Sequence, residues 1–187
     1  MPERRNKKDR MIDVASELFM QQGYEATSVR QIADEVGVTE AALYYHFKEG
    51  KQELLQAVIA CQMPNFKQIL DECKDADSLE DLILRYGNAV AQKAEYLIPR
   101  IRWFICEFSN IPQEEKNYLY QKQLIFHDGL AELIEQFVDE SETANALAWT
   151  LMCAFIGHNQ LFGGLNLKSV ADFPLTSLVT TLAKRLK

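Results

Sequence analysis

The chain has 187 residues, 48% of them hydrophobic and 25% charged, with a formal net charge of -7. This composition is sufficient to bury a core, which excludes a small disulfide-stapled scaffold and a disordered tail. The longest nearly apolar run, 148–157, is shorter than the roughly 20 residues that cross a bilayer. The four cysteines show no Cys-x-x-Cys spacing and follow no signal-peptide pattern, so we expect reduced thiols in a cytoplasmic protein.

Charge is unevenly distributed along the chain. Up to Lys51 there are eight basic and nine acidic residues, whereas 12 basic and 18 acidic residues follow. The acidity therefore lies mainly in the later part, which is not the charge of a simple nucleic-acid binder. The first ten residues contain a cationic arm formed by Arg4, Arg5, Lys7, Lys8 and Arg10. This arm is either a phosphate-binding segment or a solvated, frayed end.

Apolar residues recur three and four positions apart, without strict alternation, and this pattern predicts an all-α fold. The first helix is expected over 6–22, ending at Gly23. A short second helix, capped by Thr27 or Ser28, is expected to end at Gly37. Thr39 then caps a third helix, in which Leu43 and Phe47, four residues apart, are predicted to face the core.

Longer helices are expected from Lys51 onward. Prolines at 64, 99, 112 and 174 and the glycine pair 163–164 mark the breaks between them. The predicted helices span 51–62, 65–73, 78–97, 99–109, 113–138, 141–162 and 174–186.

Two short helices joined by a tight glycine turn, with small Ala33 where they would cross, are typical of a helix-turn-helix. The residues Gly-Tyr-Glu-Ala-Thr-Ser-Val-Arg-Gln-Ile-Ala at 23–33, Gly-Val-Thr at 37–39 and Leu-Tyr-Tyr-His-Phe at 43–47 carry a more specific signal. Over about residues 8–58 the chain closely resembles the DNA-binding domain of the tetracycline-repressor (TetR) family. The resemblance implies a DNA-binding domain over 1–51 and a helical ligand-binding and dimerisation domain over 52–187. It also implies a homodimeric repressor that a small-molecule effector releases from a palindromic DNA operator.

Helical geometry indicates which side of the third helix reads DNA. If Leu43 points inward at 100° per residue, Ala41 and Tyr45 point outward, with Ala42 and Tyr44 beside them. Small apolar side chains suit thymine methyl groups, and the hydroxyls of Thr39 and Tyr45 can reach bases or phosphates. The Glu40 carboxylate could accept a hydrogen bond from cytosine N4; otherwise it would repel the DNA phosphates.

The resemblance extends the predicted DNA site beyond that helix. It implies that Arg30 enters the groove, where a guanidinium can pair with guanine. The positions that commonly hold the DNA backbone in this family are Thr27, Ser28, Tyr44, His46 and Lys51. The turn before the fourth helix is one residue longer than usual, with Gly50 as the inserted residue, so the reach of Lys51 is an open question.

Tight binding by a helix-turn-helix usually requires two copies, with recognition helices about 34 to 36 Å apart. The last two helices carry apolar stripes that could form a four-helix dimer interface, as the resemblance also implies, or could instead be internal core. The stripe residues are Ala144, Ala148, Leu151, Phe155, Phe162, Leu175, Leu178, Val179, Leu182 and Leu186.

An effector pocket is expected among the central helices, because aromatic walls with a few polar groups suit a mid-sized, partly apolar molecule. The alternative is that these side chains are ordinary core. The candidates, on helices that enclose the pocket in this family, are Trp103, Phe104, Glu107, Phe108, Phe126, His127, Trp149, Met152 and His158.

The sequence contains residues that two rival functions would use. A metal or redox sensor would use the cysteines with His127, His158 and Glu107, but no two cysteines have the spacing of a ligand pair. An all-α enzyme is disfavoured because the sequence has no nucleophile elbow, phosphate loop or paired metal-ligand motif. We therefore expect a regulator with no catalytic residues, no bound metal and no cofactor.

Overall fold

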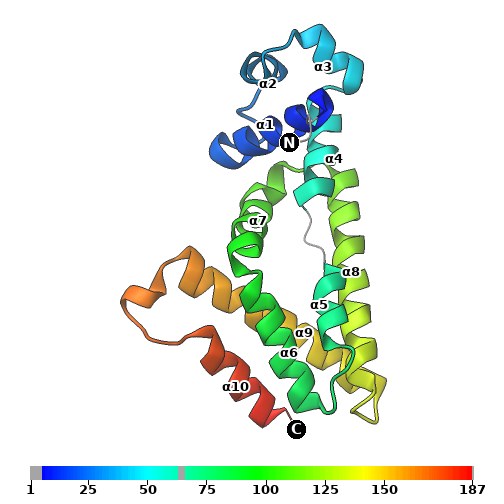
Figure 1. The fold of residues 1–187 in the computed structure, drawn as a ribbon, viewed down its shortest axis with the longest axis vertical. Coiled ribbons are helices and arrows are strands. Elements are labelled where there is room, and N and C mark those ends of the chain that lie inside the picture. The colour runs from blue at the N-terminus through cyan, green and yellow to red at the C-terminus, as the bar shows by residue number, and fades with distance from the viewer. Residues whose placement is uncertain (1–5, 63–65, 187) are drawn as a thin grey trace, which may run out of the picture. The chain divides into compact units, whose positions relative to one another are not determined.

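The computed structural model describes residues 6–62 and 66–186, and within these ranges it contains helices and no strand (Figure 1). The predicted all-α fold is confirmed. The chain forms two compact units, one of residues 1–63 with 103–116 and the other of residues 64–102 with 117–187. Within the described ranges no helix is both long and apolar enough to span a membrane. Arg4 and Arg5 of the cationic arm lie outside the described residues.

The first three helices begin and end at local signals in the sequence. α1 (Lys7–Gln22) stops at Gly23, and α2 (Val29–Val36) starts at a capping box in which Ser28 and Gln31 exchange backbone-to-side-chain hydrogen bonds. α2 ends at Gly37, whose φ of 76° is left-handed. α3 (Glu40–His46) starts where the Thr39 side chain accepts from the Ala42 N–H at 3.2 Å. The predicted ends of these helices are confirmed within one residue.

α4 (Lys51–Gln62) packs against α1 and completes the core of the first unit. Its inward face is apolar because Leu54, Leu55, Val58 and Ile59 repeat at helical spacing, and all four are buried. Residues 103–116 belong to the same unit; they comprise the end of α7 (Ala94–Glu107), the turn η1 (Phe108–Asn110) and the start of α8 (Gln113–Glu135).

The second unit contains the remaining helices. Its core is a cluster of buried apolar side chains that includes Tyr86, whose ring centroid lies 4.9 Å from that of Phe155 and 6.4 Å from that of Phe126. The unit comprises α5 (Phe66–Cys73), α6 (Leu79–Gln92), α9 (Ser141–His158), the π-helical turn η2 (Asn159–Gly164), η3 (Leu167–Ser169) and α10 (Leu175–Arg185), with parts of α7 and α8. The core side chains come from the α-helices among these elements.

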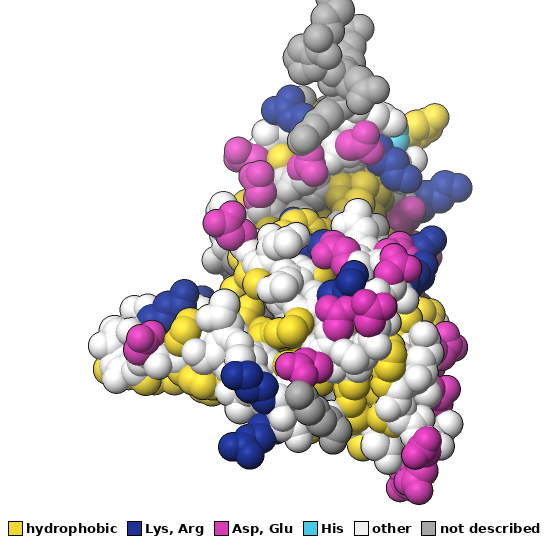
Figure 2. Space-filling view, turned by 60° about the horizontal axis from the view of Figure 1, so that its bottom comes forward, with side chains coloured by type: hydrophobic (Ala, Val, Ile, Leu, Met, Phe, Trp, Pro, Cys, Tyr) yellow, Lys and Arg dark blue, Asp and Glu magenta, His cyan; other side chains and the backbone are white. Residues whose placement is uncertain are grey.

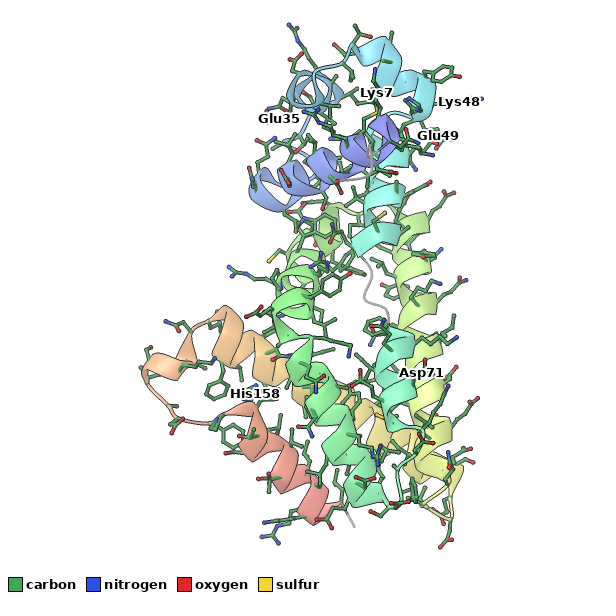
Figure 3. The ribbon with its side chains drawn as sticks, viewed as in Figure 1. Lys7, Glu35, Lys48, Glu49, Asp71 and His158 are labelled. Carbon is green, nitrogen blue, oxygen red and sulfur yellow. The ribbon has the colours of Figure 1, made fainter. Side chains whose placement is uncertain are left out.

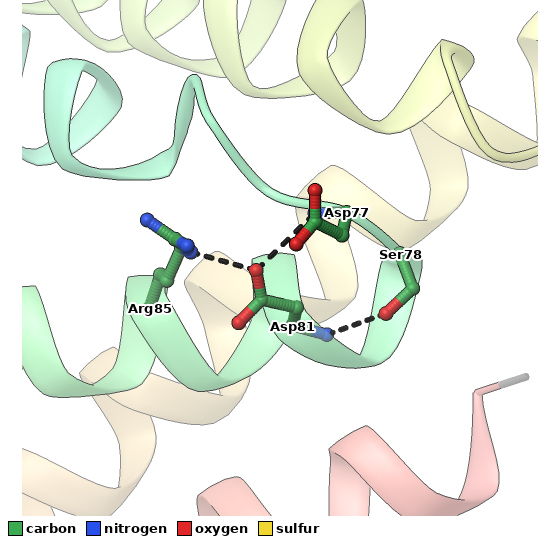
Figure 4. A network of polar contacts seen from close by, with 4 residues as sticks. All are labelled: Asp77, Ser78, Asp81 and Arg85. Carbon is green, nitrogen blue, oxygen red and sulfur yellow. Dashed lines mark hydrogen bonds and ion pairs between the residues drawn. The ribbon is translucent and has the colours of Figure 1, made fainter.

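The start of α6 is built from a small polar network (Figure 4). The Ser78 hydroxyl accepts from the Asp81 N–H at 3.1 Å and caps the helix. The Asp81 carboxylate accepts from the Asp77 N–H at 3.2 Å and from Arg85 Nε at 2.7 Å. The hydrogen bond from Arg85 is the main reason that the pKa of Asp81 is lowered.

Several predicted helix boundaries after Lys51 were wrong. We expected a break at Pro99, but α6 ends at Gln92 and α7 runs through Pro99. Pro99 cannot donate to the carbonyl four residues earlier, which weakens the helix locally. Leu97 and Ile101, on either side of Pro99, both pack against the core of the second unit, so a continuous helix buries both. The predicted 141–162 helix likewise ends earlier, at His158, and continues as η2.

Candidate nucleic-acid interface

α3 presents a two-sided arrangement that suits a recognition helix. Leu43 and Phe47 are buried in the first unit, as predicted. Tyr45, on the opposite side, is 81% exposed, and Ala41 is also exposed. The side turned away from the core is therefore free to enter a major groove.

The residues beside this face are exposed to different degrees. Thr39 and Glu40 are exposed at the start of α3, and Ala42 is partly buried. Tyr44 is 46% exposed, and the ring of His46 meets that of Tyr45 edge-on at 5.2 Å between centroids. The face thus combines small apolar groups, hydroxyls and one carboxylate, which can contact thymine methyls, base edges and phosphates.

Arg30 extends from α2 into solvent. Its Nε lies 3.9 Å from Asp34 Oδ2, and the two side chains are 79% and 73% exposed. A pair this exposed is held weakly, so the guanidinium is available to exchange Asp34 for a base or a phosphate.

Two residues predicted to hold the DNA backbone make hydrogen bonds within the protein. The Thr27 hydroxyl is buried and donates to the Gly23 carbonyl at 2.8 Å, while it accepts from Gln22 Nε2 at 3.1 Å. It positions the turn before α2, and we do not retain it as a phosphate contact. Ser28 is exposed, but its hydroxyl caps α2 by accepting from the Gln31 N–H at 3.1 Å.

Lys51 also makes internal contacts. Its Nζ donates to the carbonyls of Tyr24 at 3.0 Å and Glu25 at 3.4 Å. The same atom lies 4.3 Å from the centroid of the Tyr24 ring. By contrast Lys48 and Glu49, in the turn that follows α3 and labelled in Figure 3, are exposed.

Four of the predicted effector-pocket residues belong to the first unit: Trp103, Phe104, Glu107 and Phe108. Trp103 is buried and its Nε1 donates to the Phe19 carbonyl at 3.0 Å. Glu107 Oε2 accepts from the Tyr24 N–H at 3.1 Å. These contacts join segments more than 80 residues apart, and periodicity in the sequence contained no signal for them.

The other five predicted pocket residues belong to the second unit. Phe126 and Met152 are part of its core cluster. The ring of His127 is buried and stacks on Trp149, which is 41% exposed, at 4.3 Å between centroids.

His158, the last residue of α9 and labelled in Figure 3, is buried beside the segment that precedes α10. Its Nε2 lies 2.8 Å from the Phe173 carbonyl and its ring stacks on Phe162 at 4.8 Å between centroids. A carbonyl can only accept, so Nε2 carries hydrogen and, in the neutral ring, Nδ1 is an acceptor. Nδ1 is buried, and among residues 6–62 and 66–186 no group forms a hydrogen bond with it.

Residues proposed for a metal sensor are not gathered into one site. Within residues 6–62 and 66–186, no group of three or more His, Cys, Asp or Glu side chains could hold a metal ion. Glu107 is in the first unit, whereas His127 and His158 are in the second.

The predicted dimer stripe on α9 needs correction. Ala144, Ala148, Leu151 and Phe155 are fully or almost fully buried in the core of the single chain. They pack inward against the chain's own helices, so they cannot supply a surface for a second copy.

α10 faces the chain's own core in part. Val179 is buried against α6, and Leu175, Leu182 and Leu186 are partly buried beside the core. Leu178 and, on η2, Phe162 are partly exposed as well.

Comparison with known proteins places these features in a family. Residues 11–58 match the family model described as "Bacterial regulatory proteins, tetR family". The chain is 29% identical over 150 residues to the negative transcriptional regulator IcaR of the biofilm operon icaADBC in Staphylococcus aureus, covering 72% of this chain and 71% of IcaR.

Solved structures share the fold. A TetR transcriptional regulator from Legionella pneumophila has a TM-score of 0.68 at 21% identity, covering 96% of each chain. AibR, solved in complex with isovaleryl coenzyme A and operator DNA, also has a TM-score of 0.68, at 17% identity over 95% of this chain and 96% of its own. The domain over residues 11–58, with its exposed α3, matches the tetR family of bacterial regulatory proteins, and the chain is a DNA-binding transcriptional regulator, not an enzyme.

Proposed function

We propose that this regulator is a repressor that binds a palindromic operator as a homodimer and leaves it when a small molecule binds. The observation that carries the DNA-binding part is the α3 face, with Leu43 inward and Tyr45 outward. Repression is supported by the similarity to IcaR, which is a negative regulator.

The proposed base contacts are made by α3 and by Arg30 of α2. The α3 residues are Thr39, Glu40, Ala41, Ala42 and Tyr45. Ser28, Tyr44 and His46 are proposed to meet the DNA backbone, which sets register rather than sequence. In this proposal the DNA-binding domain ends near Lys51. The remainder of the chain binds the effector and forms the dimer, and the protein is cytoplasmic.

A dimer would use the sides of α9 and α10 that the core leaves free. Trp149 on α9 and Leu161 on η2 are 41% and 44% exposed, and Cys153 on α9 is exposed as well. Leu165 and Val170, in the connection to α10, are more exposed still. In Figure 2 this connection, at the left, shows hydrophobic side chains beside charged ones. Exposed apolar groups of this kind favour association with a second copy.

The effector is proposed to bind in the second unit near His158. The buried Nδ1 of His158 has no hydrogen-bond partner in the part of the chain that the structure describes. A buried acceptor without a donor is costly, so a ligand N–H or O–H would be stabilised there. The rings of Phe162 and Phe173 beside it suit an apolar body. AibR, a fold neighbour, has been solved with a small-molecule ligand and operator DNA together.

The decisive experiment is selection of bound fragments from the source genome by the purified protein, followed by gel-shift titration. We expect the affinity for a palindromic fragment to exceed that for a mixed-sequence duplex by about 10³-fold or more. Sedimentation should show that one dimer or more binds each site. Failure to bind any duplex at low ionic strength would refute the proposal. Operator affinity that responds to none of the compounds shown by calorimetry to bind would refute only its effector part.

A further inference from the structure

Tyr24, in the turn between α1 and α2, is held from two sides by side chains of two other helices in its own compact unit. Its N–H donates to Glu107 Oε2 at 3.1 Å, and its carbonyl accepts from Lys51 Nζ at 3.0 Å. An anion and a cation thus grip the backbone of one residue. Both bonds involve a charged partner, which makes them stronger than neutral hydrogen bonds.

Each charge lies at the end of its helix that disfavours it. Lys51 is the first residue of α4, and Glu107 is the last residue of α7. The helix dipole favours anions at the N-terminus and cations at the C-terminus, so both residues oppose it. Lys51 and Glu107 therefore both break the preference that the helix dipole sets, and both contact Tyr24. This combination indicates that the two residues have a role other than stabilising their own helices.

We propose that Lys51 and Glu107 form a clamp on Tyr24 that sets the orientation of α2 and α3, so that α4 and α7 both control DNA binding. The inference rests on the proposed function. Tyr24 is four residues before Ser28, the cap of α2, so a shift of the clamped turn moves the start of α2. Lys51 and Glu107 are then positioning residues, and Lys51 acts through the turn instead of through a phosphate.

α7 provides a second covalent connection to the DNA-binding unit, separate from α4. Residues 94–102 of this helix belong to the second unit, and residues 103–107 to the first. Trp103 adds a further bond from α7, to the Phe19 carbonyl in the last turn of α1. An effector that displaces α7 can therefore change the clamp along one continuous helix.

The test measures affinity of the full chain for a mixed-sequence genomic duplex at low ionic strength, a probe that requires no known operator. Glu107→Gln is compared with Glu114→Gln, an equal charge change at an exposed site of the same unit. Removing a negative charge should by itself tighten DNA binding. The clamp predicts the opposite for Glu107→Gln, a loss of about fivefold, because a neutral amide holds the Tyr24 N–H less strongly.

Lys51→Met separates positioning from phosphate contact. Methionine keeps an apolar chain beside the Tyr24 ring but cannot donate to the carbonyls. If Lys51 is part of the clamp, affinity falls while the slope of log affinity against log salt is unchanged; loss of a phosphate contact would lower that slope by about 1. The loss of DNA affinity in the double variant should be smaller than the product of the losses in the two single variants, because both residues hold the backbone of Tyr24.

Amide exchange supplies a second measurement. In Glu107→Gln the Tyr24 amide should exchange faster than in the wild type and in Glu114→Gln, with thermal unfolding checking that all variants are folded. The clamp is overturned if Glu107→Gln binds DNA as tightly as Glu114→Gln, or if Lys51→Met changes the salt slope. If the wild-type protein binds no duplex, both the proposed function and the clamp are refuted.

Discussion

A Cβ atom at Gly50 would lie 2.8 Å from Cε1 of Tyr44, closer than such contacts occur in proteins. Gly50 also has a φ of 63°, which L-residues with side chains rarely adopt. Gly50, in the turn between α3 and α4, thus lets the Tyr44 ring lie against the turn. The position of Tyr44 at the edge of the DNA-binding face depends on this glycine.

Gly50→Ala should therefore lower both stability and DNA affinity. The left-handed backbone alone costs about 1–2 kcal/mol for a non-glycine residue, and the methyl must also displace Tyr44. Gly37→Ala is the matched control, because Gly37 has a φ of 76° and, among the described residues, no other side chain or backbone segment within 4 Å of its added Cβ. Chemical denaturation and gel shifts would compare the two. An equal loss of DNA affinity in both variants would show that Tyr44 is not involved.

Residues on the DNA face should fall into two classes. Arg30→Ala and Tyr45→Ala should relax selectivity at particular base pairs, by about 1–3 kcal/mol each, whereas Tyr44→Ala should weaken binding to all sequences. Arg30 and Tyr45 are highly exposed, so their removal should change stability by less than about 0.5 kcal/mol. Competition gel shifts with single-base operator variants measure the difference. Uniform weakening by Arg30→Ala would exclude its base-reading role.

Close packing of α10 on α6 depends on Gly87. A Cβ at this position would overlap Val179, with Cγ1 only 2.7 Å away. Gly87→Ala should destabilise the protein by about 1–3 kcal/mol, the usual cost of overpacking a core. The double variant with Val179→Ala should recover part of this loss, since it removes the overlapping methyl groups. Thermal unfolding of the four proteins tests the coupling, and purely additive losses would contradict it.

The cap of α6 should make stability depend on pH. The pKa of Asp81 is lowered chiefly by the hydrogen bond from Arg85, so its carboxylate stabilises the folded state above its ordinary pKa of about 3.9. That contribution is lost as pH falls toward the lowered value. Asp81→Asn should thus be less stable than the wild type at pH 7, and the difference should shrink below about pH 4.

Asp77→Asn is the control for this experiment, because it makes the same charge change while it keeps the backbone N–H that Asp77 donates to Asp81. Thermal unfolding across pH 3 to 7 is the measurement. A difference between Asp81→Asn and the wild type that stays constant at low pH would mean that the ionised carboxylate is not what stabilises the helix.

Local signals were sufficient to predict the helix-turn-helix. The Ser28 and Thr39 caps, the Gly37 stop and the spacing of Leu43 and Phe47 act within one or two helical turns, and the structure bears out each of them. Such interactions depend on neighbours in the sequence, so they can be read before the fold is known. The outward direction of Tyr45 followed from the same geometry.

Features that depend on distant segments could not be predicted in this way. α7 continues through Pro99 because Leu97 and Ile101 both reach the core, although proline alone predicts a break. The stripe containing Leu151 and Phe155 has the same spacing whether it packs on its own chain or on a partner, and only the tertiary structure placed it inside.

The amino-acid sequence by itself determined the helical class, the recognition helix and the family resemblance, since these follow from periodicity, caps and a contiguous motif. The tertiary structure alone decided that Glu107 binds the backbone of Tyr24, 83 residues away, and that Lys51 turns inward to the same residue. A contact between a side chain and a distant peptide group leaves no periodic trace in the sequence, because any residue can offer the backbone atoms that it uses.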